Sequence, residues 1–174
     1  GDALSRSGGK LSVADGNWEV VLEHVDDSDF VLDTVVEISR ESVQEFARAR
    51  PGAAAAIAMA MARHLREGDW GRRGYDSANR RLDWILTVLR SLAANGRLGE
   101  FEDVAVEYVP TVEHWDRFRH NDQLALWLRA LEDPAAATLA RVIRQSDART
   151  YFTRQFGESG RFSSSALSTA IRNR

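Results

Sequence analysis

The chain has 174 residues, 44% of them hydrophobic, and a net charge of -3, which fits one folded domain and argues against a dedicated nucleic-acid or anionic-membrane binder. Cysteine is absent, so disulfides, thiol nucleophiles and cysteine-based zinc or iron–sulfur sites are excluded. Lys10 is the sole lysine, and it lies in a Ser/Gly-rich leader over residues 1–15 that we expect to be flexible. Walker-type nucleotide loops and Schiff-base chemistry, which need a lysine inside a folded element, are therefore excluded as well.

Residues 16–174 are predicted to form a single all-helical domain, because apolar residues recur at helical spacing in almost every segment. One early helix contains Val43, ends before Pro51, and either continues through Ser39 or breaks there. Residues 52–66 are apolar nearly all round, which is typical of a helix enclosed by its neighbours.

Glycine, proline and small polar residues mark the boundaries of further helices in the second half of the chain. Glycine adopts the left-handed conformation that closes a helix, proline cannot continue one, and small polar residues cap a helix start. The predicted boundaries are a stop at Asn95-Gly96, a stop at Pro110, a start at Thr111 and a start at Asp133-Pro134. Before the first of these stops, a long helix carries an apolar face made of Ala78, Leu82, Ile85, Leu89 and Leu92.

The fold class follows from these segments. No stretch of useful length alternates polar and apolar residues with a period of two, so a sheet has no support. The helical segments are separated by loops of about two to six residues, as in packed helix pairs. We predict an all-α fold of about ten helices, either an irregular α-solenoid of the ARM/HEAT type or a compact helical bundle. No cofactor and no metal ion is expected.

The segment over residues 68–76, GDWGRRGYD, lies between two apolar helices. Its glycine spacing differs from that of a dinucleotide-binding loop, and the strand that such a loop requires does not precede it. The segment is therefore a bend between helices or a partner-binding corner, and phosphate binding is the least favoured interpretation. Trp, Tyr and Arg are the usual anchors of protein interfaces, so the candidate binding residues are Trp70, Arg72, Arg73 and Tyr75.

A second polar cluster contains His114, Asp116 and His120. The two histidines are six positions apart and lie on different faces of a helix, so their spacing does not match a metal site. Asp116 and His120 are four apart and can meet as an ion pair on a solvated face. A hydrolase built around these three residues is the least favoured functional hypothesis.

The C-terminal third of the chain is richer in arginine than the rest. Residues 110–174 hold ten arginines against seven acids, and arginines alternate there with aromatic residues. An RNA- or DNA-binding helical domain that uses this third is therefore the alternative function. It predicts salt-sensitive binding that weakens when Arg149, Arg154 and Arg161 are neutralised.

The order of features over residues 18–110 resembles a known class of domain. A turn and short helix, DDSDFVLDTVVEI, precede a proline, an apolar helix that ends in MARHLRE, and a long helix, RLDWILTVLRSLAANGRL. With Trp84 and the Asn95-Gly96 stop, this order is similar to the helical C-terminal domains that follow WD-repeat propellers in eukaryotic scaffold proteins. The katanin regulatory subunit, the large mRNA-decapping scaffold and ribosome-biogenesis propeller proteins are examples. The resemblance implies a module that binds partners or self-associates without catalysis.

The favoured function is therefore a non-enzymatic protein–protein interaction or oligomerisation module, cut from a larger scaffold or regulatory protein. We expect it to be cytoplasmic and to bind a protein partner or a second copy of itself. No membrane partner is expected, because no apolar run approaches the roughly 18 residues that a membrane helix needs.

Overall fold

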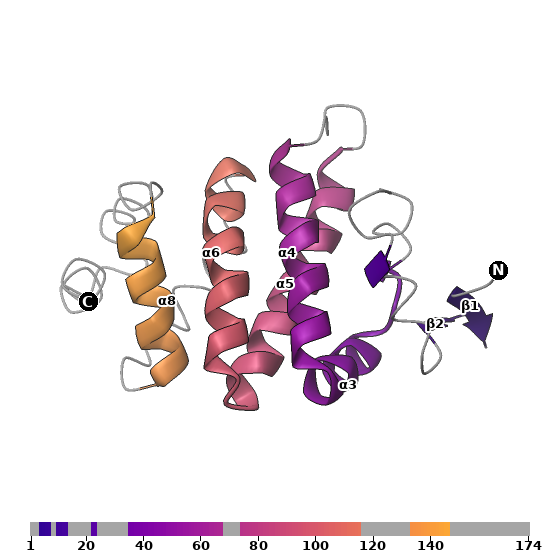
Figure 1. Cartoon of the computed structure of the whole chain (residues 1–174). Coiled ribbons are helices and arrows are strands. Elements are labelled where there is room, and N and C mark those ends of the chain that lie inside the picture. Colours follow the sequence, from indigo (N-terminus) through magenta and orange to yellow (C-terminus); the bar gives the residue numbers. More distant parts are fainter. Residues whose placement is uncertain are drawn as a thin grey trace.

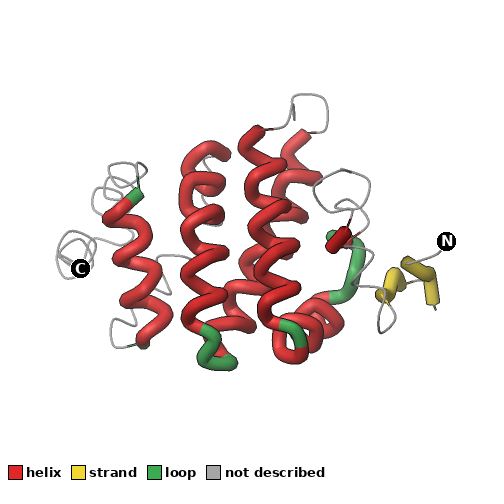
Figure 2. Tube along the Cα trace, in the orientation of Figure 1, coloured by secondary structure: helices red, strands yellow, loops and turns green. Residues whose placement is uncertain are grey.

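The computed structural model describes six stretches of the chain, and helices dominate them (Figure 1, Figure 2). These stretches are residues 4–7, 10–13, 22–23, 35–67, 74–115 and 133–146. The five helices with bounds inside them are α3 (Arg40–Ala49), α4 (Pro51–Glu67), α5 (Gly74–Ala94), α6 (Leu98–Trp115) and α8 (Pro134–Gln145). The predicted helical class is confirmed for these residues, while the predicted total number of helices also concerns residues outside them.

A short β-hairpin precedes the helices. β1 (Leu4–Ser7) pairs antiparallel with β2 (Lys10–Val13), with Leu4 opposite Val13 and Ser7 opposite Lys10. The sequence analysis found no sheet, because strands of four residues are too short to show a clear alternation. A two-stranded ribbon of this size is marginal by itself.

Ser39 marks the start of α3, so of the two predictions for this segment the break is the correct one. Its hydroxyl oxygen accepts a hydrogen bond from the backbone N–H of Ser42 at 3.3 Å, as an N-cap does. The helix then ends at Ala49, and Pro51 occupies the first position of α4, where its fixed φ suits a helix start. The predicted end before Pro51 is confirmed.

The end of α5 and the start of α8 also lie where the sequence placed them. Gly96 has a φ of 70°, and the N–H of Arg97 donates to the carbonyl of Leu92 at 2.9 Å, which closes α5. At α8, Asp133 Oδ1 accepts a backbone N–H at 2.8 Å, and Pro134 is the first helical residue. Short local signals decide both boundaries.

The prediction that Pro110 ends a helix is wrong, because α6 continues past it. Thr111 does not cap a new helix, and its hydroxyl donates back to the carbonyl of Glu107 at 2.7 Å. Pro110 lacks the N–H that would bond the carbonyl of Val106, but Val106 is 53% exposed, so the missing bond lies on the solvent side of α6 and not in the core. Arg66 of α4 also donates to the Glu107 carbonyl at 2.6 Å, so tertiary contacts hold a turn that the local rule would break.

The helices are arranged in two layers. α4, α6 and α8 lie side by side, and α4 and α6 run in the same direction because α5 reverses the chain between them (Figure 1). In the second layer α3 packs against α5, and α5 also packs against α4 and α6. The largest fully buried apolar and aromatic side chains of the described residues are Ile57, Met61, Leu65, Leu82, Ile85, Leu89, Phe101 and Tyr108.

α4 is the enclosed helix that its sequence predicts. Small side chains on it let neighbouring helices approach closely, and the Thr111 hydroxyl of α6 comes within 3.3 Å of the Ala62 carbonyl. Its buried residues are Ala54, Ala55, Ile57, Ala58, Ala60, Met61, Ala62 and Leu65. None of the helices in the described stretches combines the length and apolarity needed to cross a bilayer.

Candidate functional site

The predicted partner-binding corner falls largely outside the described residues. Trp70, Arg72 and Arg73 lie outside them, and Tyr75 belongs to the first turn of α5, where only the backbone is described. The hypothesis that these four side chains bind a partner therefore stays a prediction.

Most residues of the two other predicted clusters also lie outside the described residues. Asp116 and His120 lie beyond the end of α6, and His114 is inside α6 with only its backbone described. The arginines proposed for nucleic-acid binding, at positions 149, 154 and 161, lie outside as well. Among the residues that the structure describes, no group of three His, Asp or Glu side chains is placed to hold a metal ion.

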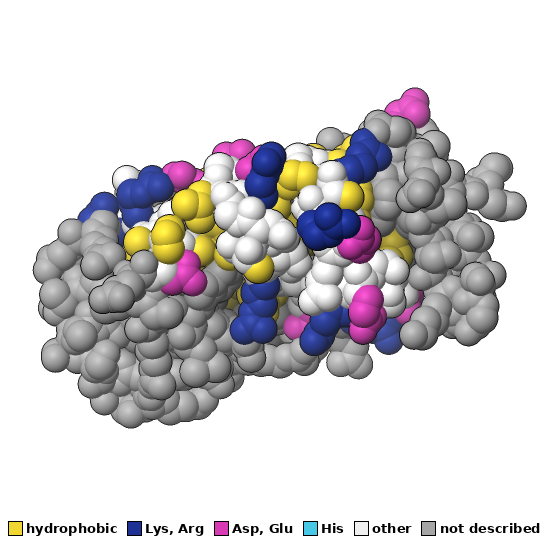
Figure 3. All heavy atoms as spheres, turned by 90° about the horizontal axis from the view of Figure 1, so that it is seen from below, with side chains coloured by type: hydrophobic (Ala, Val, Ile, Leu, Met, Phe, Trp, Pro, Cys, Tyr) yellow, Lys and Arg dark blue, Asp and Glu magenta, His cyan; other side chains and the backbone are white. Residues whose placement is uncertain are grey.

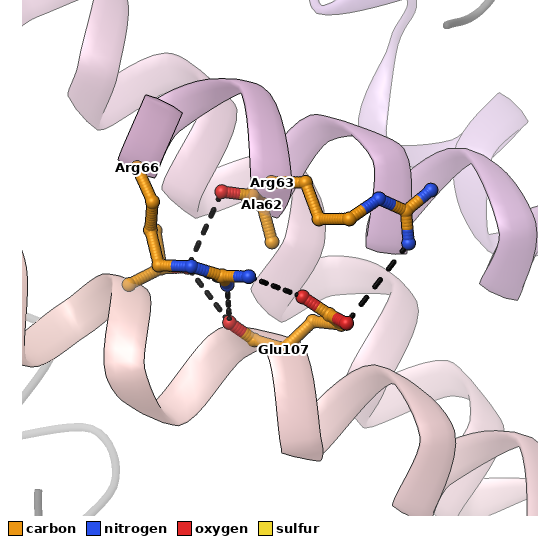
Figure 4. Close-up of polar contacts among 5 residues, drawn as sticks. Ala62, Arg63, Arg66 and Glu107 are labelled. Carbon is orange, nitrogen blue, oxygen red and sulfur yellow. Dashed lines mark hydrogen bonds and ion pairs between the residues drawn. The ribbon is translucent and has the colours of Figure 1, made fainter. Parts of the chain in front are cut away.

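A polar cluster joins α4 to α6 (Figure 4). Arg66 Nη2 donates to Glu107 Oε2 at 2.5 Å, and Arg66 Nη1 donates to Thr111 Oγ1 at 2.9 Å. Arg63 Nη1 lies 4.0 Å from the other carboxylate oxygen, Glu107 Oε1. Thr111 is fully buried, and its hydroxyl faces the carbonyls of both Glu107 and Ala62. We call these five residues the α4–α6 polar cluster, and its contacts fix one helix against the other.

Ion pairs link the remaining described helices. Arg141 Nη1 of α8 lies 2.7 Å from Glu102 Oε1 of α6, and this hydrogen bond lowers the pKa of Glu102 and raises that of Arg141. Arg80 of α5 pairs with Glu37, just before α3, at 2.5 Å. Seen from below, positive and negative side chains are interspersed over the described helices (Figure 3). On this face the described charged side chains of both signs are mixed and form no continuous basic surface.

A groove of about 450 Å³ lies between α3 and the last turns of α5. The α5 wall is low because Ser91 and Ala94 are small. Ser91 Oγ donates to the carbonyl of Thr87 at 2.8 Å and Asn95 Nδ2 donates to the carbonyl of Ser91 at 2.7 Å, so neither side chain crosses the groove. The lining residues are Glu41, Gln44, Glu45 and Arg48 of α3, Arg90, Ser91 and Ala94 of α5, and Asn95 just after α5. We call this hollow the α3–α5 groove.

Two charged residues of the α3–α5 groove neutralise each other. Arg48 Nε donates to Glu45 Oε2 at 3.1 Å, and Arg48 Nη2 binds the other oxygen of the same carboxylate. The hydrogen bond and then the charge of Arg48 lower the pKa of Glu45. The side chains of Arg48 and Glu45 are 58% and 64% exposed, so the pair adds little to stability.

The sequence analysis did not identify this groove. Its signal is the set of polar and small residues, Ser91, Ala94 and Asn95, that surrounds the end of the apolar face at Leu92. That change makes a hollow only because the long side chains of α3 stand beside it. Which helix packs next to α5 cannot be read from the sequence of α5 alone.

Comparisons with known proteins leave the function to be argued from these features. The chain matches no protein-family model, no curated protein and no solved structure.

Proposed function

We propose that the chain is a non-enzymatic protein–protein interaction or oligomerisation module of a larger scaffold or regulatory protein. The observation that carries the proposal is the open α3–α5 groove, which two helices of one layer build together. The groove is open to solvent and is lined by charged, amide and small side chains, which suit the side chains of a docking protein segment.

The proposal extends to the architecture, which we take to be an irregular α-solenoid and not a compact bundle. Within the layers α3 packs with α5, α4 with α6 and α6 with α8, while α3 and α5 also contact helices of the other layer. α3 and α8, at opposite ends of the described helices, share no extensive contact. Such quasi-one-dimensional stacking leaves extended faces that helical-repeat proteins use for binding.

On this proposal the chain corresponds to the helical domains that follow WD-repeat propellers, and it acts in the cytoplasm. The corner that contains Trp70, Arg72, Arg73 and Tyr75 is then a second contact for the same partner. The alternative, nucleic-acid binding by the C-terminal third, receives no support from Arg141, which is paired with Glu102.

A matched pair of substitutions tests the proposal. Ala94→Trp fills the α3–α5 groove, and Ala56→Trp places the same side chain on the exposed face of α4. Both alanines are exposed and helical, so both variants are expected to fold. Sedimentation velocity over a wide concentration range and affinity capture from cells are then compared with the wild-type chain.

We expect the wild-type chain to self-associate or to retain a defined protein, and Ala94→Trp to weaken that contact while Ala56→Trp leaves it intact. A chain that remains monomeric at every concentration and retains no protein would contradict the proposed function. Loss of the contact in Ala56→Trp alone would keep the function but move the interface to the α4 face.

A further inference from the structure

We propose that Asn95 is a site of spontaneous deamidation, where the chain converts a side-chain amide beside the α3–α5 groove into a carboxylate. The turn over residues 91–97, which we call the closing turn of α5, controls how often the reaction occurs. The reaction goes beyond the proposed function and does not depend on it. Its basis is the Asn95-Gly96 pair and the hydrogen bonds that hold this pair.

Asn95 differs from the other asparagines of the chain in the residue that follows it. Of the five asparagines in the sequence, Asn95 alone precedes a glycine. Asparagine is chemically labile, and a following glycine has no side chain to shield its backbone nitrogen or restrict its rotation. Both residues are exposed, and a Cβ added at Gly96 would meet nothing within 4 Å. The pair therefore has open space in which its two reacting groups can meet.

The reaction is intramolecular and needs water as its co-reactant. The backbone nitrogen of Gly96 attacks Cγ of Asn95, the bond from Cγ to Nδ2 breaks, and ammonia leaves with the proton of the attacking nitrogen. The product is a cyclic imide, which forms without an enzyme because the reacting groups belong to adjacent residues. Water then adds to either ring carbonyl and breaks its bond to the nitrogen, which gives aspartate or isoaspartate.

The closing turn of α5 holds both reacting groups in other interactions. The N–H of Gly96 donates to the carbonyl of Ala93 at 3.1 Å, and Nδ2 of Asn95 donates to the carbonyl of Ser91 at 2.7 Å. Both bonds must break before the ring closes. They are local, and neither Asn95 nor Gly96 belongs to the buried core, so the closing turn opens without global unfolding. The rate of deamidation therefore reports how often this turn opens.

Deamidation changes the end of α5 and the groove together. A carboxylate oxygen replaces the amide donor, so the hydrogen bond to the Ser91 carbonyl is lost and two acceptors face each other. Isoaspartate also lengthens the backbone, which moves the N–H of Arg97 away from the Leu92 carbonyl that it bonds at 2.9 Å. The product has a weaker closing turn and a new negative charge at the α3–α5 groove, which Asn95 lines.

Peptide mapping by mass spectrometry tests the reaction on the intact chain after incubation at neutral pH. We expect the mass shift of an amide-to-acid conversion to accumulate at Asn95, as a mixture of aspartate and isoaspartate. Asn79, which precedes Arg80 inside α5, is the internal control and should stay unchanged. Asn95→Gln should suppress the shift, because glutamine has to close a larger ring. No conversion at Asn95, or equal conversion at Asn79, would overturn the proposal.

Two variants at position 97 test the control by the closing turn. Arg97→Pro removes the N–H that bonds the Leu92 carbonyl, whereas Arg97→Ala keeps it and removes only the side-chain pair with Glu100. We expect conversion to be about fivefold faster in Arg97→Pro, the factor for one backbone hydrogen bond, and unchanged in Arg97→Ala. Equal rates in the two variants would refute control by this turn.

Circular dichroism and thermal unfolding establish whether Arg97→Pro folds. If it does not, urea below the unfolding transition of the wild-type chain provides the same test, because it favours local opening. The rate at Asn95 should then rise with urea while Asn79 stays unchanged. A rate at Asn95 that does not respond to urea would contradict the proposed control.

Discussion

The contact between α4 and α6 and the contact between α3 and α5 both contain small residues. The first contact is closed, whereas the second contains a groove. In both, two helices contact each other and small residues lie at the contact. At the first contact Ala62 is buried, and Arg66 of α4 forms an ion pair with Glu107 of α6. At the second, Ser91 and Ala94 leave a groove of about 450 Å³.

The difference depends on where the long side chains go. Arg66 of α4 binds Glu107 of α6, so its guanidinium bridges the two helices. Arg48 of α3 turns back to Glu45 of its own helix and leaves α5 uncovered. Small residues therefore make either a tight contact or a hollow, and the pairing of the neighbouring arginine decides which. We infer that the first contact serves stability and the second serves binding.

A larger side chain placed in each contact is expected to give the largest difference in stability between the two contacts. Ala62→Leu inserts three carbons into a fully buried position and should lower the free energy of unfolding by about 1–3 kcal/mol. Ala94→Leu enters the open groove and should change it by less than about 0.5 kcal/mol. Urea unfolding of both variants makes the comparison. Similar losses would show that the α3–α5 contact is as closed as the other.

Double-mutant cycles compare the two arginine pairs directly. For Arg66→Met with Glu107→Gln, whose native side chains are 24% and 20% exposed, we expect a coupling energy of about 1.5 kcal/mol. For Arg48→Met with Glu45→Gln, both more than half exposed, we expect about 0.5 kcal/mol or less. Denaturant unfolding with added salt should reduce the second coupling further. A larger coupling at the exposed pair would reverse our assignment of roles.

A pair of glycines tests the end of α5 that borders the groove. Gly96 has a φ of 70°, so Gly96→Ala should destabilise the chain by about 1 kcal/mol through backbone strain. Gly99 is helical, and a Cβ added there meets nothing within 4 Å, so Gly99→Ala should stabilise the chain by about 0.5 kcal/mol. Thermal unfolding should move in opposite directions for the two variants, and movement in the same direction would contradict the assigned conformations.

The smallest expected effect concerns the pair between α6 and α8, which is a third contact of the same layered kind. The pKa of Glu102 is lowered from its ordinary value of 4.5, so the pair contributes stability above that pH and loses it as the pH falls through the lowered pKa. Because both side chains are more than a third exposed, the contribution is only a few tenths of a kcal/mol. Stability of Glu102→Gln and of the wild-type chain should converge in acid. A difference that persists there would mean that the charge is not its source.

Local signals in the sequence were enough for many helix boundaries. Ser39, the Asn95-Gly96 stop and Asp133 each act through atoms within a few residues, so their effects could be predicted without knowing the fold. The class of the fold followed from the same helical spacing. Pro110 was the exception, since contacts from α4 outweigh its local preference.

The α3–α5 groove and the α4–α6 polar cluster were beyond prediction for a physical reason. Arg66 and Glu107 are 41 positions apart, and Glu41 and Ser91 are brought together only by the packing of α3 on α5. Neither pair has a sequence signature, because the sequence does not show which distant residue an arginine or glutamate will contact. The predicted corner at Trp70 rests on composition alone, and its side chains lie outside the described residues.

A photo-cross-linking residue at position 94 tests the central claim most directly. p-Benzoylphenylalanine replaces Ala94 in one variant and Ala56 in the other, each within the full chain in cells, and adducts are identified by mass spectrometry. We predict a defined protein adduct, either another protein or a second copy of the chain, at position 94 and little or none at position 56. No adduct at position 94, or equal adducts at both positions, would contradict the account.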